Sequence, residues 1–433
     1  MPLPTADPYL PGHGDRSWSA RHYDLSLDYT VDENRLRGEA RITGVALSDT
    51  SRIVVDLAGL AVAKLTMDGK QPKWAARGDR LVITPRSPLT EGAEFTLVLK
   101  YAGVPRPTIA THHGDAGWEE LTDGVIVAGQ PHGAPTWFPC NDRMDDKAAY
   151  RIEVTTQPGY TVVANGDLTA RIRRGSGETW VYEQDEPMSP YLATVQIGRY
   201  ELTALDPGEA GVPITIAAVP GADWRPAFGH QPQIMAAFSR LFGPYPFPTY
   251  TVVITDDELE IPLESQSLST FGRNFLNADW RLNRLVAHEL AHQWFGNTVT
   301  AASMQDIWLH EGFACYAEWL WSEEAGRETA QAWAERHHQK LSQLPQDLVL
   351  GDPGPADMFD DRVYKRGALL LHALRERIGD DVFFELLRAW VRRHRGSCVT
   401  TADFVALAEE LSGTSLGTLF ETWLQERSLP GLR

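Results

Sequence analysis

The sequence is poor in cysteine and has no long apolar runs. It contains three cysteines among 433 residues, Cys140, Cys315 and Cys398, and no two of them have CxxC spacing. An odd number of scattered cysteines argues against a disulfide framework and is typical of a reducing compartment, so the cytoplasm is the expected location. No apolar stretch is long enough to span a bilayer, and no basic N-terminal region precedes an apolar run, so neither a membrane segment nor a secretory signal is expected.

Positive charge is also scarce. Lysine and arginine total 40 against 58 aspartates and glutamates, which gives a formal net charge of −18. Because binding to phosphates requires clustered lysine and arginine, this balance argues against a nucleic acid or an anionic membrane as a partner. The hydrophobic fraction of 43% and the length indicate a folded protein of two or three domains, whereas the oligomeric state does not follow from composition.

Apolar and polar residues alternate along the first half of the chain, between turns rich in Gly, Pro and Asp. This period of two predicts half-buried strands of an antiparallel sheet. The clearest examples are residues 23–29, 81–83, 95–99, 150–155, 160–164 and 179–183. We therefore expect an N-terminal β domain over residues 1–205, followed by a boundary at the Pro- and Gly-containing segment 206–213.

The second half, residues 206–433, has mainly helical spacing. The expected helices are 233–242, 312–322, 364–378, 382–393, 402–411 and 416–425. Two short strands are expected at 249–254 and 264–271, the second at a sheet edge because Pro262, just before it, cannot donate a ladder hydrogen bond. The predicted fold class is α+β, with a β domain followed by a mostly helical lobe beside a small sheet.

The segment HELAH at 288–292 has the spacing of a metal site. Residues four apart lie on one face of a helix, so His288 and His292 can direct two imidazoles at one ion. Catalytic zinc takes three nitrogen or oxygen ligands and keeps one position for water. Glu311, separated from His292 by 18 residues, is the next carboxylate able to supply the third ligand. Glu289 is then placed to act as a general base on the water.

Two further features of this region complete the predicted metal centre. Glu318 follows Glu311 by seven residues on the same helical face, so it is predicted to orient a ligand histidine. The pair Gly296 and Asn297 predicts the end of the helix that carries both histidines. A lone HExxH also arises by chance, and its residues then have ordinary surface or core roles. The apolar flanks and the third carboxylate favour one zinc ion per chain.

These residues resemble the zinc core of the M1 aminopeptidases, the gluzincin group that includes aminopeptidase N and leukotriene A4 hydrolase. The match rests first on HELAHQWFGN followed by DIWLHEGFACYAE. Upstream, TWFPCND and PMSPYLATVQIGRY resemble parts of that family's N-terminal β domain, and downstream YKRGALLLHAL resembles its Tyr-x-Lys/Arg-Gly segment. The resemblance covers nearly the whole chain. It implies a saddle-like β domain followed by a thermolysin-like catalytic domain, in a short two-domain form.

The resemblance also implies a function and further site residues. It implies a zinc-dependent aminopeptidase that acts on peptides with a free N-terminus. Tyr364 would donate a hydrogen bond to the oxyanion of the tetrahedral intermediate, which stabilises charge that develops only in the transition state. Glu264 would hold the α-ammonium group of the substrate.

The sequence departs from the family pattern at two places near the expected ammonium site. In IPLES, residues 261–265, Glu264 is kept, but its Gly, Met and Asn neighbours are replaced. In GQPHGAP, residues 129–135, Gln130 is followed by His132 where relatives carry a carboxylate or an amide. A neutral imidazole can accept a hydrogen bond from an ammonium group, whereas a protonated one repels it, so we expect activity to fall at mildly acid pH partly through His132.

Other functions remain open at this stage. The sequence shows no counterpart of the C-terminal domains that cover the site in full-length relatives, so a zinc endopeptidase of thermolysin type is one alternative. An epoxide hydrolase side activity has little specific support. A non-catalytic M1-like binding module is the alternative from a different class, and it predicts a damaged set of zinc ligands, whereas every chemical position is filled here. The preferred first side chain and the physiological substrate do not follow from the sequence.

Overall fold

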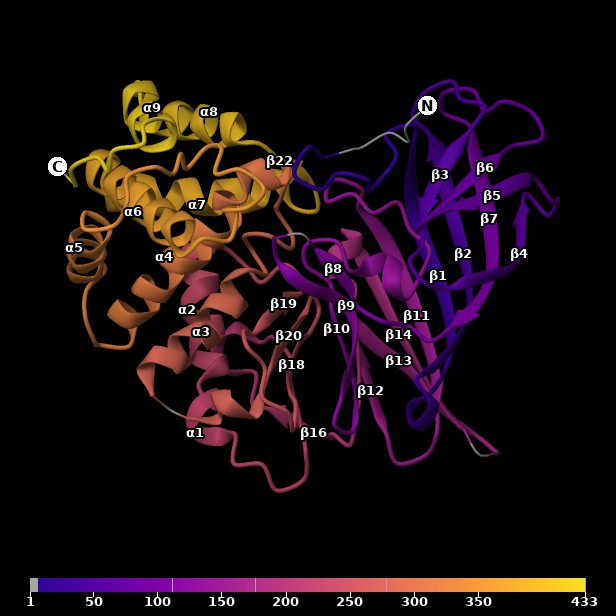
Figure 1. The fold of residues 1–433 in the computed structure, drawn as a ribbon. Coiled ribbons are helices and arrows are strands. Elements are labelled where there is room, and N and C mark those ends of the chain that lie inside the picture. Colours follow the sequence, from indigo (N-terminus) through magenta and orange to yellow (C-terminus); the bar gives the residue numbers. More distant parts are fainter. Residues whose placement is uncertain (1–6, 111, 176, 278, 433) are drawn as a thin grey trace. The chain divides into compact units, whose positions relative to one another are not determined.

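The computed structural model describes residues 7–110, 112–175, 177–277 and 279–432. Residues 1–6, part of the segment in which no secretory signal was expected, lie outside this description. The chain divides into two compact units (Figure 1). Unit 1 comprises Met1–Thr203, Thr215–Ala222 and Phe247–Arg273, and unit 2 comprises Ala204–Ile214, Asp223–Pro246 and Asn274–Arg433. The first change of unit lies close to the predicted boundary after residue 205, and the division into folding domains at that point remains a prediction.

Unit 1 is built mainly from β-strands. Its largest sheet has the strand order β13-β14-β11-β1-β2-β7-β4. The bounds of these strands are β1 (Trp18–Thr30), β2 (Arg35–Ala46), β4 (Ala61–Met67), β7 (Glu94–Gly103), β11 (Ala148–Thr156), β13 (Asp167–Arg174) and β14 (Gly177–Met188). A three-stranded sheet has the order β3-β6-β5, with bounds β3 (Ile53–Asp56), β5 (Lys73–Arg77) and β6 (Arg80–Thr84).

Two five-stranded sheets contain most of the remaining strands. One has the order β12-β15-β10-β9-β8, with bounds β8 (Thr108–Ala110), β9 (Gly114–Leu121), β10 (Gly124–Ala128), β12 (Thr161–Ala164) and β15 (Val195–Gly198). The other has the order β16-β17-β18-β20-β19, with bounds β16 (Glu201–Leu205), β17 (Ile214–Ala218), β18 (Tyr250–Ile254), β19 (Leu263–Ser265) and β20 (Leu268–Phe271).

The alternating sequence explains the large sheet, with one difference in strand direction. Tyr23, Leu25 and Leu27 on β1 are buried, while the residues between them are partly exposed, so one face of the strand lies in the core. The neighbouring pairs of this sheet are antiparallel except for β1 and β11, which run parallel with Tyr23 opposite Tyr150. Alternation does not encode strand direction, so the parallel pair was not predicted.

The segment predicted as one strand at 264–271 is a tight hairpin. Strand β19 pairs antiparallel with β20, and Glu264 lies opposite Ser269. Ser267 in the turn has a φ of 60°, a left-handed conformation that is uncommon for serine. Strand β19 is the last strand of its sheet, so the predicted edge position is confirmed for the half that carries Glu264.

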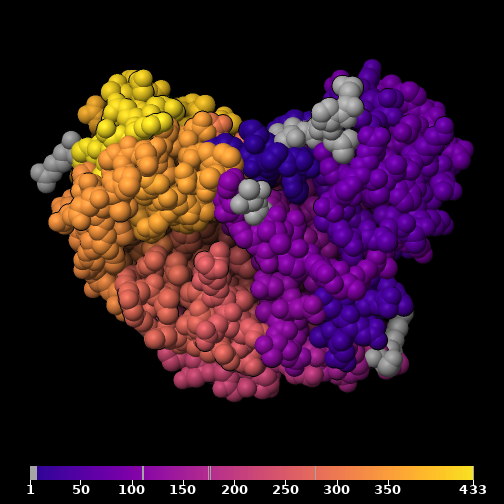
Figure 2. Space-filling view, in the orientation of Figure 1, coloured from indigo at the N-terminus to yellow at the C-terminus, as the bar shows by residue number. Residues whose placement is uncertain are grey.

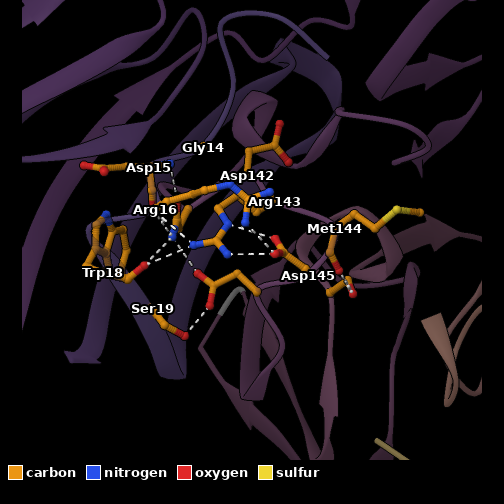
Figure 3. Close-up of polar contacts among 12 residues, drawn as sticks. Gly14, Asp15, Arg16, Trp18, Ser19, Asp142, Arg143, Met144 and Asp145 are labelled. Carbon is orange, nitrogen blue, oxygen red and sulfur yellow. Dashed lines mark hydrogen bonds and ion pairs between the residues drawn. The ribbon is translucent and has the colours of Figure 1, made fainter. Parts of the chain in front are cut away.

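A buried polar network fixes the segment of residues 136–146 within unit 1. The Asn141 side chain accepts a hydrogen bond from Asp15 N at 2.7 Å and donates to Asp15 O at 3.1 Å. Figure 3 shows Arg143 facing the Asp145 carboxylate, with Nε–Oδ1 and Nη2–Oδ2 distances of 2.8 and 2.9 Å. Arg80 donates from Nε to Asp56 Oδ1 at 2.9 Å. Each buried charge therefore has a partner, as a core of this polarity requires.

Unit 2 is mostly helical. Its helices are α1 (Arg225–Phe228), α2 (Gln231–Phe242), α3 (Trp280–Ala291), α4 (Trp308–Glu324), α5 (Ala330–Leu341), α6 (Asp361–Ile378), α7 (Asp380–His394), α8 (Thr401–Ser412) and α9 (Gly417–Gln425). A two-stranded sheet joins β21 (Thr300–Ala301) and β22 (Cys398–Val399). Helices α8 and α9, coloured yellow, lie at the surface of this unit (Figures 1 and 2). No helix in the described part of the chain has the length and apolar character that a membrane span needs.

The close crossing of α4 and α6 depends on two glycines. A Cβ atom built on Gly312 would lie 2.8 Å from the Cα atom of Gly367, and the converse distance is the same. Real Cβ atoms essentially never approach this closely, so the two backbones can meet only without side chains. The crossing places the start of α6 beside the part of α4 that begins at Glu311.

Candidate active site

Helix α3 and its C-cap residue carry the two histidines of the HELAH segment on one face. It begins after Asp279, whose side chain accepts a hydrogen bond from Arg281 N. It ends at Ala291, so the predicted end at Gly296 and Asn297 was placed too late. The chain continues into a tighter turn after Ala291, and His292, the C-cap residue, keeps helical angles of φ −56° and ψ −25°. For this reason His292 still shares a face with His288.

Three donor atoms converge between α3 and α4. Glu311 Oε2 lies 3.4 Å from His288 Nε2 and 3.5 Å from His292 Nε2. All three residues are buried, with exposures of 5% for His288, 1% for His292 and 2% for Glu311. Among the described residues, these three form one of the sets whose ligand atoms could hold a metal ion.

The spacing of these donors matches a zinc ion. Two ligand atoms each about 2.1 Å from a tetrahedral zinc lie about 3.4 Å apart, which agrees with both donor distances to Glu311. Two imidazoles and one carboxylate form a donor set of the type found in catalytic zinc sites. The residues present therefore suit zinc.

The outer nitrogen of each histidine is also engaged. His288 Nδ1 lies 2.8 Å from Glu318 Oε1, and His292 Nδ1 lies 3.1 Å from Phe295 O. Because a carboxylate and a carbonyl oxygen are acceptors, each Nδ1 must carry the proton and donate it. The lone pairs are then on the two Nε2 atoms, which face Glu311. The structure thus brings Glu318 to the ligand histidine that it was predicted to orient.

Glu318 lies in a buried pocket with two cations. Arg284 Nη1 is 2.5 Å from Glu318 Oε2, and Lys365 Nζ lies 3.4 Å from Cys315 Sγ. Burial by itself raises the pKa of the Glu318 carboxyl, but Arg284 and Lys365 outweigh burial and lower that pKa well below its usual range. Burial likewise raises the pKa of the Cys315 thiol to about 12. Glu318 is therefore held as a carboxylate and Cys315 as a thiol.

Glu289 and Tyr364 lie beside the convergent donors in unit 2. Glu289 is buried at 4% exposure, and one of its carboxylate oxygens lies within 4.8 Å of a ring nitrogen of His292. Tyr364, half-buried on the first turn of α6, stacks on His288 with ring centroids 6.0 Å apart and an interplanar angle of 19°. A carboxylate that can exchange a proton and a phenol thus both lie near His288 and His292.

Gln130 and Glu264 form a hydrogen-bonded pair within unit 1. Gln130 donates from Nε2 to Glu264 Oε1 at 2.6 Å, and Glu264 is 9% exposed. Strand β19 presents Glu264, and the loop of residues 129–135 presents Gln130. The amide fixes one oxygen of the carboxylate, which suits a side chain that must hold a defined position toward a cation.

His132 is buried in the same loop and stacks on another histidine. It is 7% exposed, and its ring lies 4.8 Å from the ring of His13 at an interplanar angle of 17°. His13 Nδ1 is 2.6 Å from Asp142 Oδ2. In the described part of the chain no hydrogen-bond partner meets His132 Nδ1. Burial and the neighbouring His13 lower the pKa of His132, so its neutral form is favoured.

Comparison with known proteins places the chain in a family. The model for the Peptidase M1 N-terminal domain matches residues 19–192, and the model for the Peptidase family M1 domain matches residues 227–423. The chain belongs to peptidase family M1. An M1 zinc metallopeptidase from Deinococcus radiodurans is similar in structure, with a TM-score of 0.90 and 31% identity over 99% of this chain and 98% of that one. A mutant of the M1 enzyme from that organism, bound to the substrate Tyr-Ser-Ala, has a TM-score of 0.91 and 32% identity over the same shares.

Curated relatives are longer than this M1 chain. Probable aminopeptidase 1 of Sulfurisphaera tokodaii is 25% identical over 95% of this chain and 53% of its own length. Leucyl aminopeptidase of Saccharolobus solfataricus is 26% identical over 95% of this chain and 54% of its own. The chain therefore spans about half the length of the curated relatives it matches. The predicted family, the two-domain α+β fold and zinc as cofactor are confirmed.

Two charged residues beside this cluster of candidate ligands were missed in the sequence. Arg284 precedes His288 by four residues, so the helical spacing that paired the histidines also places Arg284 on their face. Lys365 directly follows Tyr364 and gave no local signal, because its burial depends on the crossing of α4 and α6. It is 7% exposed.

Replacing His132 by Gln is expected to weaken the acid-side loss of activity. Protonation of His132, whose pKa is lowered, should occur below its usual range, and the resulting cation lies against His13 and near Asp142 and His113. Glutamine keeps a polar side chain but does not titrate in this range. The fall in kcat/KM between about pH 7 and 5 should therefore be smaller by roughly twofold or more.

A pH–rate profile of kcat/KM tests this, with His112→Gln as a control for loss of a histidine elsewhere in the unit. Glutamine is preferable to glutamate at this buried position, because a second carboxylate near Asp142 would add repulsion. An unchanged acid limb in His132→Gln would remove His132 from the account of pH dependence.

Proposed function

We propose that this chain is a zinc-dependent aminopeptidase that releases the N-terminal residue of peptides. The observation that carries the proposal is the convergence of His288, His292 and Glu311, whose donor atoms are spaced for one zinc ion. We propose these three as the zinc ligands. The names of the relatives and the bound peptide of the similar M1 enzyme support a peptide as the substrate.

When bound, zinc supplies a Lewis acid that polarises the scissile carbonyl and lowers the pKa of a water molecule. Glu289 accepts a proton from the attacking water and returns it to the leaving amine. Its burial and its closeness to His292 suit this role. Tyr364 donates a hydrogen bond from its phenolic hydroxyl to the developing oxyanion. Stacking on His288 fixes the plane of its ring.

Recognition of the free N-terminus falls to unit 1 in this proposal. Glu264 pairs with the α-ammonium group, and Gln130 holds the Glu264 carboxylate through its amide. His132 lies in the same loop as Gln130, so its neutral form avoids a second positive charge near the ammonium. A cytoplasmic location is part of the proposal, because Cys140 and Cys315 are buried free thiols.

A panel of aminoacyl-arylamides, with and without an N-acetyl block, tests the reaction. We expect the free amines to be hydrolysed and the acetylated ones to lose roughly a hundredfold or more in kcat/KM, because the block removes the charge that Glu264 binds. A chelator should abolish both rates, and added zinc should restore them.

Two of the alternative functions predict different results in this panel. Cleavage of N-acetylated peptides as fast as of free peptides would indicate a thermolysin-type endopeptidase. A zinc-loaded protein that hydrolyses no member of the panel and no longer peptide would indicate a non-catalytic binding module. Either result would overturn the aminopeptidase proposal.

A further inference from the structure

We propose that Arg284 is a positioning residue of the metal centre, which acts through Glu318 to hold His288 in the orientation and tautomer that zinc binding requires. The inference rests on the proposed role of His288 as a zinc ligand. The inference gives Arg284, which lies on the same helix as His288, a role in retaining the metal. Arg284 touches neither the ion nor the substrate in this account.

The contacts form a continuous chain from Arg284 to His288. Arg284 Nη1 donates to Glu318 Oε2 at 2.5 Å, and His288 Nδ1 donates to Glu318 Oε1 at 2.8 Å. Each oxygen of the carboxylate therefore has one strong donor. The Glu318 side chain is 4% exposed, while that of Arg284 is 29% exposed. The carboxylate is thus fixed at both ends inside the protein, with solvent reaching only the arginine.

Arg284 and His288 lie on the same face of α3, so both can reach Glu318. Residues 284, 288 and 292 follow one another at intervals of four along α3, so they form a single stripe. On α4, Glu311 and Glu318 are seven residues apart and also share a face. Arg284 and His288 of the α3 stripe both contact the second of these glutamates. Removing Arg284 takes away the donor to Glu318 Oε2, so the orientation of the carboxylate toward His288 is less strictly fixed.

The expected consequence concerns metal affinity more than turnover. A carboxylate that accepts from the outer nitrogen of a ligand histidine fixes the ring and raises its basicity, and loss of such a partner costs roughly 10- to 100-fold in metal affinity. Arg284 contacts Glu318 and not the histidine, so it is one contact further from the metal than Glu318 is. We therefore expect Arg284→Gln to raise the zinc Kd by about tenfold, and Arg284→Lys, which keeps the charge but not the planar fork, by about threefold.

Competition with a chromophoric chelator measures the zinc Kd of the full chain directly, without a peptidase assay. Glu318→Gln should raise the zinc Kd by about 10- to 100-fold, and the double variant Arg284→Gln/Glu318→Gln should match Glu318→Gln alone within about twofold. Such coupling shows that Arg284 works through Glu318. Independent, additive effects of the two substitutions would overturn the inference, as would an Arg284→Gln Kd equal to wild type.

Arg240→Gln is the matched control for Arg284→Gln. Arg240 pairs with Glu324 at 2.5 Å and so contacts the same helix α4. Among the described residues, the carboxylate that hydrogen-bonds His288 Nδ1 is Glu318 and not Glu324. The zinc Kd of Arg240→Gln should equal that of wild type. Thermal unfolding of the metal-free proteins checks the fold, and if Arg284→Gln does not fold, Arg284→Lys decides: a wild-type Kd in that variant would count against the inference.

A second comparison separates this inference from the proposed function. His292→Ala removes a proposed ligand and should weaken zinc binding far more than Arg284→Gln does. If His292→Ala binds zinc as wild type does, the ligand assignment and the proposed function fail with it. If His292→Ala loses zinc while Arg284→Gln retains it fully, only the role of Arg284 is wrong.

Discussion

Replacing Glu289 by Gln is expected to lower kcat for peptide hydrolysis by about 10⁴-fold while zinc remains bound. Glutamine has the shape of glutamate but cannot accept a proton from the attacking water. Glu289 is buried at 4% exposure, so bulk buffer has little access to replace it. The measurement is kcat on an aminoacyl-arylamide together with the zinc content of the purified variant.

The control for this substitution is Glu324→Gln, which makes the same chemical change on α4 at a partly exposed ion pair with Arg240. It should retain full activity. A Glu289→Gln enzyme with near wild-type turnover would show that another group takes the proton. Loss of zinc together with activity would instead indicate that Glu289 supports the metal.

Replacing Tyr364 by Phe is expected to lower kcat by roughly 10²- to 10³-fold with little change in KM. The oxyanion exists only on the way to the tetrahedral intermediate, so its hydrogen bond contributes to the transition state and not to substrate binding. Phenylalanine keeps the ring that stacks on His288, so the variant isolates the hydroxyl. Steady-state kinetics at saturating zinc measure both constants.

Tyr316→Phe provides the comparison for loss of a phenol. Tyr316 is buried on α4, and its hydroxyl lies 3.2 Å from His372 Nδ1. This variant should lose some stability but keep kcat, because its hydroxyl is engaged inside the helical unit. An unchanged kcat in Tyr364→Phe would show that the hydroxyl does not stabilise the transition state, and a rise in KM alone would assign Tyr364 to substrate binding.

The convergence of the candidate metal ligands could be predicted from the sequence because its geometry is local. A four-residue interval on a helix sets the directions of His288 and His292, and the same rule reaches Glu318 from Glu311. The rule also extends back to Arg284, which gave no signal of a metal site because a guanidinium group does not ligate metals. Lys365 has no such local relation to Glu318. Its place in the pocket depends on the packing of α6 against α4, which residue spacing does not specify.

Other parts of the fold could not be predicted from the sequence, for different physical reasons. Helix α5 carries few apolar residues, and the buried ones are Ala330, Ala334 and Leu341, so its periodic signal is weak. The hairpin of β19 and β20 lacks a Gly or Asn-Gly turn, and Ser267 adopts a left-handed conformation instead. The parallel pairing of β1 with β11 joins residues more than a hundred positions apart, beyond the reach of any alternation rule.

The glycine pair at the crossing of α4 and α6 limits how the enzyme can be altered. Glu311 directly precedes Gly312, and Tyr364 lies three residues before Gly367, so the spacing of these two helices sets the distance between the Glu311 carboxylate and the Tyr364 phenol. A single methyl group at either glycine would clash with the opposite backbone and push the two helices apart. For protein engineering, these two positions without side chains are therefore as restrictive as the ligands, and a mutational library should leave them fixed.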